Sequence, residues 1–494
     1  MTKITISELE NYLWESAVIL RGSMSAGSYK NFIFPLLFYK RICDVYDEEY
    51  KEALAVSSGD EEYAVMSENH KFIIPKECHW SVVRNTSMDV GKAIQKALKG
   101  IESANASLCG VFGDATWTNK ERLPDSLLKD LIEHLSSKIL SIENCPADEL
   151  GIGYEYLVGK FADDSGHTAQ EFYTNRTIVH LMTELLQPRS SERIYDPTCG
   201  SGGMLISSVV YLKENNQEWR SVKLYGQELN PLTSSIGKMN LFLHGIENFE
   251  IVQGDTLSNP HFVENGKLKQ FDIVLANPPY SIKQWDRLKF ENDPYGRNII
   301  GTPPQIRADF AFFQHILKSM DPKTGRCAIL FPHGILFREE ERTLREKLIK
   351  MDVVECIIGV AKGLFFNSPM EACVVICNNS KQKNMIGKVK FIDAKNDFVK
   401  DGAHNKLSDE NIRRIKDAYF AENDIPGFMA VKTNDELLKN GAKLSLALNV
   451  ASVAQKHETT VDEAFDIWNE SRFELENAMS ELMTMISGGV NNEM

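Results

Sequence analysis

The sequence contains few cysteines, and no two of them form a Cys-x-x-Cys pair. The nine cysteines are scattered over 494 residues, and no cysteine–histidine spacing fits a zinc site. This usage is typical of reduced, mostly buried thiols in a cytoplasmic protein, so we expect no metal. No apolar run is long enough to span a membrane. The amino terminus, Met-Thr-Lys-Ile-Thr-Ile-Ser, does not have a signal-peptide pattern.

The sequence also lacks an excess of basic residues. Lysine and arginine number 55 against 69 aspartates and glutamates, which gives a formal net charge of −14 at pH 7. Phosphate contacts dominate the affinity of proteins for nucleic acids, so a chain this acidic is poorly suited to hold DNA alone. Either its substrate is not DNA, or a partner supplies much of the basic surface.

Strand-like and helix-like segments alternate over the middle of the chain. Apolar runs of strand length occur at 193–195, 222–226, 249–253, 271–276, 326–331, 354–358, 372–377 and 389–392. Segments with helical periodicity separate most of them, and this alternation predicts a parallel sheet with helices on both faces. We therefore predict a doubly wound α/β core over 141–395, an N-terminal helical domain over 1–140 and a C-terminal helical region over 396–494.

The two flanking regions carry helix signals and no catalytic chemistry. Ser7 and Glu10 fit a capping box at the start of the first helix. A second helix is expected over 29–46, with Pro35 near its start or at a kink. Its basic residues are expected on a solvated face rather than on a phosphate, and they are Lys30, Lys40 and Arg41.

The C-terminal region contains a heptad pattern that ends in a Gly-Gly tail. Its members recur at alternating steps of three and four: Phe465, Trp468, Arg472, Leu475, Met479, Leu482 and Ile486. Ordinary packing within one chain and contact with a partner helix both explain such a seam.

One glycine-rich turn lies between the predicted strand 193–195 and the helix that follows it. It reads Asp196-Pro197-Thr198-Cys199-Gly200-Ser201-Gly202-Gly203. This is neither a triphosphate-binding loop nor a dinucleotide fingerprint. Its glycines still permit positive φ angles and a close approach of backbone to a ligand. Acidic residues end the next two strands: Glu228 suits two vicinal ribose hydroxyls, and Asp255 suits an adenine amino group.

The apolar run 271–276 ends in Asn277-Pro278-Pro279-Tyr280. Prolines cannot continue a central strand, so the chain must leave the sheet at its carboxyl edge, where open α/β sheets bind ligands. The Asn277 side-chain oxygen and the Pro278 carbonyl can accept both hydrogens of an exocyclic base amine and free its lone pair for reaction. Tyr280 offers a stacking face for an extruded base. A plain strand-ending turn is the alternative interpretation.

Taken in order, these motifs resemble the gamma class of S-adenosylmethionine-dependent DNA amino-methyltransferases. The resemblance extends to the modification subunit of type I restriction–modification systems and covers nearly the whole chain. The N-terminal stretches that carry it are 20–24, 29–30 and 37–42, with the loop Glu171-Phe172-Tyr173-Thr174 before the core. After the Asn-Pro-Pro-Tyr motif, the matching stretches are 307–312, 333–338, 363–366 and 391–394.

The resemblance implies a Rossmann-like methyltransferase core with S-adenosylmethionine as cofactor. It implies that Glu228 binds the cofactor ribose and Asp255 the adenine ring. The residues implied to hold the methionine part are Glu171, Phe172, Tyr173, Thr174, Asn175, Arg176, Asp196, Thr198, Gly200, Ser201, Gly202 and Gly203. Asn175 departs from the family, which commonly has proline there. Those implied to present the target adenine are Asn277, Pro278, Pro279 and Tyr280.

The resemblance further implies that the substrate is double-stranded DNA and that a separate subunit reads its sequence. Neither 281–309 nor 395–494 is obviously basic or rich in base-reading side chains, which fits this division of labour. A second copy of the chain and a restriction (nuclease/translocase) subunit are further partners that the family leaves open. Two alternatives stand beside this reading: a glutamine or RNA amino-methyltransferase, and a catalytically silent methyltransferase-like scaffold.

Overall fold

The structure is a computed structural model that describes residues 3–24, 26–164, 174–364, 371–401, 404–450 and 461–490. The chain divides into two compact units, Met1–Ala451 and Ser452–Met494. The domain boundaries predicted after residues 140 and 395 both lie within the first unit, and they stay predictions.

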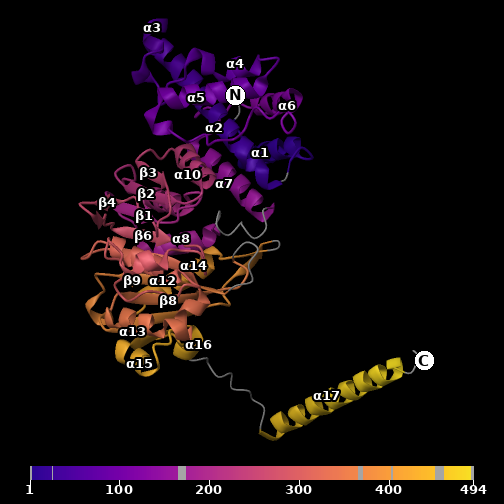
Figure 1. The fold of residues 1–494 in the computed structure, drawn as a ribbon, viewed down its shortest axis with the longest axis vertical. Coiled ribbons are helices and arrows are strands. Elements are labelled where there is room, and N and C mark those ends of the chain that lie inside the picture. Colours follow the sequence, from indigo (N-terminus) through magenta and orange to yellow (C-terminus); the bar gives the residue numbers. More distant parts are fainter. Residues whose placement is uncertain are drawn as a thin grey trace. The chain divides into compact units, whose positions relative to one another are not determined.

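The amino-terminal part of the first unit is helical, as predicted (Figure 1). Its α-helices are α1 (Ile6–Leu20), α2 (Ala26–Val56), α3 (Glu61–Ala64), α4 (Trp80–Arg84), α5 (Val90–Ala104), α6 (Asp125–Ser136) and α7 (Ala147–Asp164). Their apolar side chains form one buried cluster, which also takes in Ile236, Met239 and Leu243 of α10 (Pro231–Leu243). Helix α10 thus joins the helical part to the sheet.

The capping box of α1 lies two residues earlier than the sequence predicted. Thr5 is the N-cap: its hydroxyl accepts the Glu8 N–H at 3.3 Å, and the Glu8 carboxylate accepts the Thr5 N–H at 3.0 Å. Ser7 and Glu10 have the same i, i+3 spacing, so spacing alone cannot choose between the two pairs. The assignment to Ser7 was therefore wrong.

Two of the basic residues of α2, Lys40 and Arg41, are not on a solvated face, and Lys30 is half-buried. Lys40 is 3% exposed and pairs with Asp44, and Arg41 is 6% exposed. The Arg41 guanidinium donates to the carbonyls of Leu140 and Cys145. The segment around these carbonyls covers the helix face, so the solvated-face prediction was wrong for both residues. Pro35 lies inside α2, which begins at Ala26.

The second half of the first unit is built on a nine-stranded sheet. Its order is β13-β10-β8-β9-β7-β6-β1-β2-β3. The strands are β1 (Arg193–Asp196), β2 (Lys223–Glu228), β3 (Phe249–Gln253), β6 (Ile273–Ala276), β7 (Arg326–Pro332), β8 (Val354–Val360), β9 (Ala372–Asn378), β10 (Lys388–Ala394) and β13 (Met429–Thr433). All eight predicted strands are present. The prediction of an all-parallel sheet was wrong, because β9 and β13 run antiparallel to their neighbours.

Helices cover both faces of this sheet, which confirms the doubly wound α/β class. Successive strand residues such as Tyr195 and Ile194 belong to opposite clusters, because side chains alternate between the two faces of a strand. One face carries α8 (Arg176–Leu186), α9 (Gly203–Glu214) and α14 (Asp409–Phe420). The other carries α12 (Asp309–Ser319), α13 (Arg342–Lys350), α15 (Asn434–Lys439) and α16 (Leu446–Asn449).

The region 396–494 is not wholly helical. It contains β11 (Val399–Asp401), β12 (His404–Lys406) and β13, and β13 extends the main sheet. The second unit holds α17 (Val461–Val490), where the heptad pattern predicted a helix. Among those of its side chains that the structure describes, the exposed apolar ones are Phe465, Trp468, Phe473, Leu475, Met479 and Leu482. Further short elements include β4 (Val263–Glu264), β5 (Lys267–Leu268) and α11 (Arg287–Glu291).

The remaining expectations from composition concern thiols and membranes. Eight of the nine cysteines are buried and only Cys109 is exposed, which confirms mostly buried thiols. Within the described residues, none of the helices combines the length and the apolar character needed to cross a lipid bilayer.

Candidate active site

The predicted site residues gather where the central strands end. Strand β1 pairs in parallel with β2 on one side and with β6 on the other, so the order of strands reverses there. Asp196 is the last residue of β1, Glu228 the last of β2, and Asn277 follows the last residue of β6. A reversal of strand order opens a ligand-binding crevice at the carboxyl edge of α/β sheets.

The glycine-rich turn after β1 requires its glycines. Gly200 and Gly202 have φ values of 52° and 80°, which are left-handed. Helix α10 packs so closely that a Cβ on Gly237 would lie 2.9 Å from the Gly200 carbonyl oxygen. From the same helix, the Asn240 side-chain amide donates to the Ser201 carbonyl at 2.9 Å. Contacts from α10 therefore fix the conformation of the glycine-rich turn.

The Glu228 carboxylate is bound directly to this turn. One oxygen accepts the Gly200 N–H at 3.0 Å, and the other accepts the Asn230 N–H at 2.8 Å. The side chain stays half-buried, and each carboxylate oxygen can accept a further hydrogen bond. The structure thus brings together the glycine turn and the acid that the sequence assigned to the cofactor ribose.

Asp196 is a buried acid beside Glu228. It is 2% exposed and accepts the Thr198 N–H at 3.0 Å. Burial, followed by the nearby Glu228 charge, raises the pKa of Asp196 to about 8. A positive charge nearby would favour the ionised form of Asp196. The Asp196–Glu228 pair therefore fits a ligand that carries a positive group.

Asp255 forms its own turn just after β3. One of its oxygens accepts the backbone N–H groups of Leu257 and Ser258 at 2.9 and 3.2 Å, and the other accepts the Ser258 hydroxyl at 2.8 Å. The next residue, Thr256, donates its hydroxyl to the Pro197 carbonyl at 2.5 Å. This bond ties the Asp255 turn to the glycine-rich turn.

The Asn277 side chain is hydrogen-bonded through both of its polar atoms. Its nitrogen donates to the Thr174 hydroxyl at 3.0 Å, and its oxygen accepts the Tyr280 hydroxyl at 2.8 Å. Burial raises the pKa of the Tyr280 hydroxyl well above its ordinary value, so this hydroxyl remains a donor. Pro278 is buried and Pro279 half-buried. Thr174 and Asn277, 103 residues apart, therefore meet as predicted for one site.

The two residues after Thr174 connect the Asn277 contact to the glycine-rich turn: Asn175 directly precedes α8, and Arg176 lies beside that turn. Asn175 is the N-cap of α8: its side-chain oxygen accepts the Thr177 N–H at 3.0 Å. The Arg176 guanidinium lies against Gly203, where an added Cβ would be 1.4 Å from its Nη1. It also pairs with Glu155 at 2.6 Å. Position 203 must therefore be glycine if Arg176 is to stay in place.

Three predicted cofactor residues, Glu171, Phe172 and Tyr173, lie outside the described residues. Two residues that sequence reasoning missed support the site. Arg297 is 1% exposed and donates to the carbonyls of Thr256 and Leu257 at 3.0 and 2.8 Å, which holds the Asp255 turn. Asp309 accepts the Ser281 N–H directly after Tyr280. The only sequence signal was for Asp309, which lies in a stretch that resembles the family.

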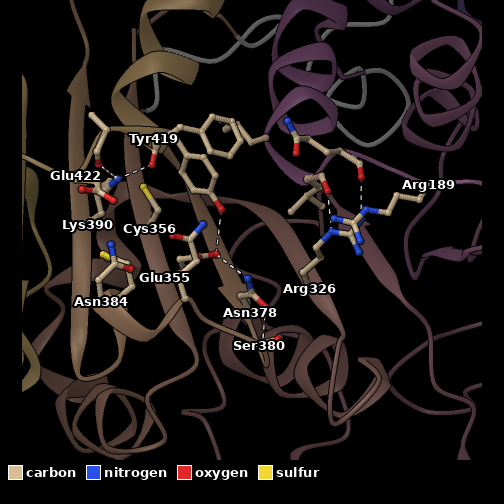
Figure 2. Close-up of a pocket in the computed structure, with 17 residues that line it drawn as sticks. Arg189, Arg326, Glu355, Cys356, Asn378, Ser380, Asn384, Lys390, Tyr419 and Glu422 are labelled. Atoms are coloured by element: carbon tan, nitrogen blue, oxygen red, sulfur yellow. Dashed lines mark hydrogen bonds between the residues drawn. The ribbon is translucent and has the colours of Figure 1, made fainter. Parts of the chain in front are cut away.

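A hollow of about 230 Å³ lies at the opposite end of the strands (Figure 2). Two of its cations bind helix ends: Arg326, half-buried, donates to the carbonyls of Leu186 and Gln187 at the end of α8, and Lys390, buried, donates to carbonyls at the end of α14. Glu355 accepts from Asn378 and Tyr419. These charges are already paired within the protein, so the cluster anchors the two helices to the sheet.

The sheet order and the groups at its carboxyl edge define a Rossmann-like methyltransferase of the α/β class. Residues 146–458 match the family described as N-6 DNA methylase, and residues 9–135 match the HsdM N-terminal domain. The chain belongs to the N-6 DNA methylase family, and this membership identifies it as an adenine-N6 DNA methyltransferase. The family resemblance stated from the sequence is confirmed.

Relatives of known name agree with this membership. The type I restriction enzyme MjaVII methylase subunit of Methanocaldococcus jannaschii is 29% identical over 92% of this chain and 80% of that protein. The MpnII methylase subunit of Mycoplasma pneumoniae is 26% identical over 97% of this chain and 95% of that protein. The solved methyltransferase subunit of a type I restriction-modification system from Streptococcus thermophilus aligns with a TM-score of 0.81, at 29% identity over 91% of this chain and all of that one.

Proposed function

We propose that the chain is the modification subunit of a type I restriction–modification complex. In this role it transfers a methyl group from S-adenosylmethionine to the N6 atom of an extruded adenine in double-stranded DNA. The observation that carries the proposal is the hydrogen bond between Asn277 and Thr174, because it joins the Asn-Pro-Pro-Tyr motif to the loop before α8. Arg176, the first residue of α8, lies against Gly203 of the glycine-rich turn.

The acidic pair at the glycine turn fits the cofactor. S-adenosylmethionine, when bound, supplies the methyl group on a positively charged sulfonium. Residues 196–203 and 171–176 would hold its methionine part, beside the buried carboxyl of Asp196. Glu228 would accept from the ribose hydroxyls, since two backbone N–H groups already orient its carboxylate. Asp255 would accept from the adenine ring of the cofactor.

The Asn-Pro-Pro-Tyr turn would hold the target base. The Asn277 oxygen and the Pro278 carbonyl would each accept one hydrogen of the adenine amine, which makes its lone pair available. Fixed φ angles at Pro278 and Pro279 mean that little freedom is lost when the base binds. Tyr280 would stack on the base, and its hydroxyl would then release the Asn277 oxygen that it binds at 2.8 Å. No covalent enzyme intermediate and no metal are needed.

A separate specificity subunit would read the DNA sequence. Helix α17 supports this division because apolar residues, among them Phe465 and Leu475, repeat along it at heptad spacing. A stripe of this length suits a partner helix. The net charge of −14 is a second support, since the partner would supply basic surface for DNA. A second copy of the chain and a restriction subunit would complete the complex.

The experiment is methyl transfer by the complex that the chain forms with a specificity subunit. Transfer of labelled methyl groups to DNA is measured, and sequencing of methylated sites gives the target. Asn277→Ala should abolish transfer and leave the cofactor Kd, measured by calorimetry, unchanged within about twofold. Glu228→Gln should raise that Kd about tenfold or more, because charged hydrogen bonds are lost.

Asn215→Ala, at the exposed end of α9, is the control and should alter neither quantity. Full transfer by the Asn277→Ala variant would refute the assignment. Transfer to a protein or RNA substrate instead of DNA, or none by the wild-type complex, would favour the amino-methyltransferase or scaffold alternatives.

A further inference from the structure

The residue directly after the Asn-Pro-Pro-Tyr motif has an unfavourable backbone conformation. Ser281 has a φ of 53°, in the left-handed region that residues with a Cβ disfavour. Serine is not glycine, so the surrounding structure must hold it there. Strain at this position is informative because it lies one residue from Tyr280.

A buried carboxylate holds Ser281. The Asp309 side chain accepts the Ser281 N–H at 2.7 Å, and Asp309 is 1% exposed at the start of α12. Its other oxygen accepts from the Arg338 guanidinium at 2.8 Å. Arg338 lies against the backbone of Gly334, where an added Cβ would be 2.6 Å from the guanidinium. The Asp309 carboxylate is thus held between a backbone N–H and an arginine that is itself fixed.

The motif is short and is fixed at both ends. At one end, Ala276 pairs with Ile329 in the sheet. At the other end, Asp309 binds Ser281. Prolines at 278 and 279 fix two of the intervening φ angles. The conformation of Ser281 therefore decides much of where the Tyr280 ring lies and whether its hydroxyl reaches Asn277.

We propose that Asp309, supported by Arg338, is a positioning residue for methyl transfer: it keeps Ser281 left-handed and thereby sets the places of Asn277 and Tyr280. This inference rests on the proposed function. Without the carboxylate, Ser281 relaxes to an ordinary negative φ and turns Tyr280 away from its place. Asp309 itself touches neither substrate nor cofactor.

The test uses rescue by a second substitution in the full complex. Asp309→Ala should lower kcat for DNA methylation about 100-fold, the order expected for a misplaced reacting group, with cofactor Kd unchanged within about twofold. Adding Ser281→Gly should recover about tenfold, because glycine adopts the left-handed conformation without strain. Adding Ser281→Ala instead should recover nothing. Asp309→Asn, which keeps an acceptor for the Ser281 N–H, should lose less activity.

Asp352→Ala is the matched control. Asp352 also accepts a backbone N–H, from Gly387 at 2.8 Å, and binds the Lys381 ammonium, but it lies next to β8 and away from the motif. It should lower the unfolding temperature without lowering kcat. Equal rescue by Ser281→Gly and Ser281→Ala, or a cofactor Kd that rises in step with the loss of kcat, would overturn the positioning role.

Two further outcomes separate this inference from the proposed function. An active wild-type complex with an equally active Asp309→Ala variant would overturn the positioning role alone. A wild-type complex that transfers no methyl group would overturn the proposed function and the positioning role with it.

Discussion

At the scale of single residues, Glu341 is an unusual carboxylate. Its side chain is fully buried, and neither of its oxygens has a hydrogen-bond partner among the described residues. Its nearest ion-pair contact is Arg338, at 3.6 Å. Burial outweighs the attraction of Arg338 and raises the pKa of Glu341 to about 7.

This pKa predicts a pH dependence of stability. An acid whose pKa is raised by folding stabilises the folded state fully below its ordinary pKa, and this contribution is lost as the pH rises through about 7. The melting temperature should therefore fall as the pH rises from about 4.5 to about 7, and this contribution should not change further above that range. Glu341→Gln should flatten that fall, and Glu339→Gln, an exposed neighbour, should not. Parallel melting curves for Glu341→Gln and wild type would contradict the prediction.

The positions of Asn277 and Glu228 at strand ends were predictable from the sequence, and the roles assigned to them stay predictions. The burial of Arg297 was not predictable, since an arginine in a polar loop gives no sign that it will be buried on two carbonyls. The burial of Arg41 was missed for the same reason, because it depends on the carbonyls of Leu140 and Cys145, about a hundred residues away.

At the scale of elements, the residue before α8 both caps the helix and connects it to a distant segment of the chain. Asn175 caps the helix, and its side-chain nitrogen also donates to the Asn405 carbonyl at 3.2 Å. The family commonly has proline at this position, and the asparagine side chain supplies another way to fix the same turn. The helix cap at Asn175 therefore lies directly beside Thr174, which binds Asn277.

Asn175→Ala should lower the free energy of unfolding by about 1 kcal/mol, the usual effect of losing an N-cap. On the proposed function it should also weaken cofactor binding, because Thr174 and Arg176 flank it. Ser408→Ala removes the N-cap of α14 and is the matched control. Denaturant unfolding should show similar losses for both variants, and calorimetry should show a raised cofactor Kd for Asn175→Ala only. A raised Kd in both variants would contradict the prediction.

Strand positions were predictable from the sequence, but strand direction was not read correctly. Strands buried on both faces are apolar throughout, whichever way they run, so β9 looked like its parallel neighbours. The missed signal was the connection from β8 to β9, which is too short for a crossover helix. A short connection allows only the antiparallel pairing that is observed.

At the scale of the whole molecule, the chain consists of a large unit and a one-helix unit. The net charge left open a partner that supplies basic surface, and the heptad pattern indicated one place where a partner helix could bind. Neither could decide between packing within the chain and a partner helix, because both bury the same stripe.

A chain truncated after Ala451 tests this organisation. Its melting temperature should stay within about 2 °C of the full chain, because the sheet and its covering helices are intact. Cofactor binding by calorimetry should be unchanged. Co-purification with the specificity subunit should be lost, and the double substitution Phe465→Ser/Leu475→Ser in the full chain should weaken it in the same way. A truncated chain that still co-purifies would place the partner contact on the larger unit.

The paired state of Asn277 has a consequence for how the enzyme would choose its base. The amide oxygen already has a donor, the phenol of Tyr280, so an incoming adenine competes with a side chain and not with water. Entry is then an exchange of one donor for another, with little net gain in affinity. A base without an amino group at that position would displace the Tyr280 hydroxyl without offering another hydrogen-bond donor. The Asn277 oxygen would then have no partner, and the binding free energy would be less favourable by about 1–3 kcal/mol. Selectivity would thus come from rejecting the wrong nucleobase more than from holding the right one tightly.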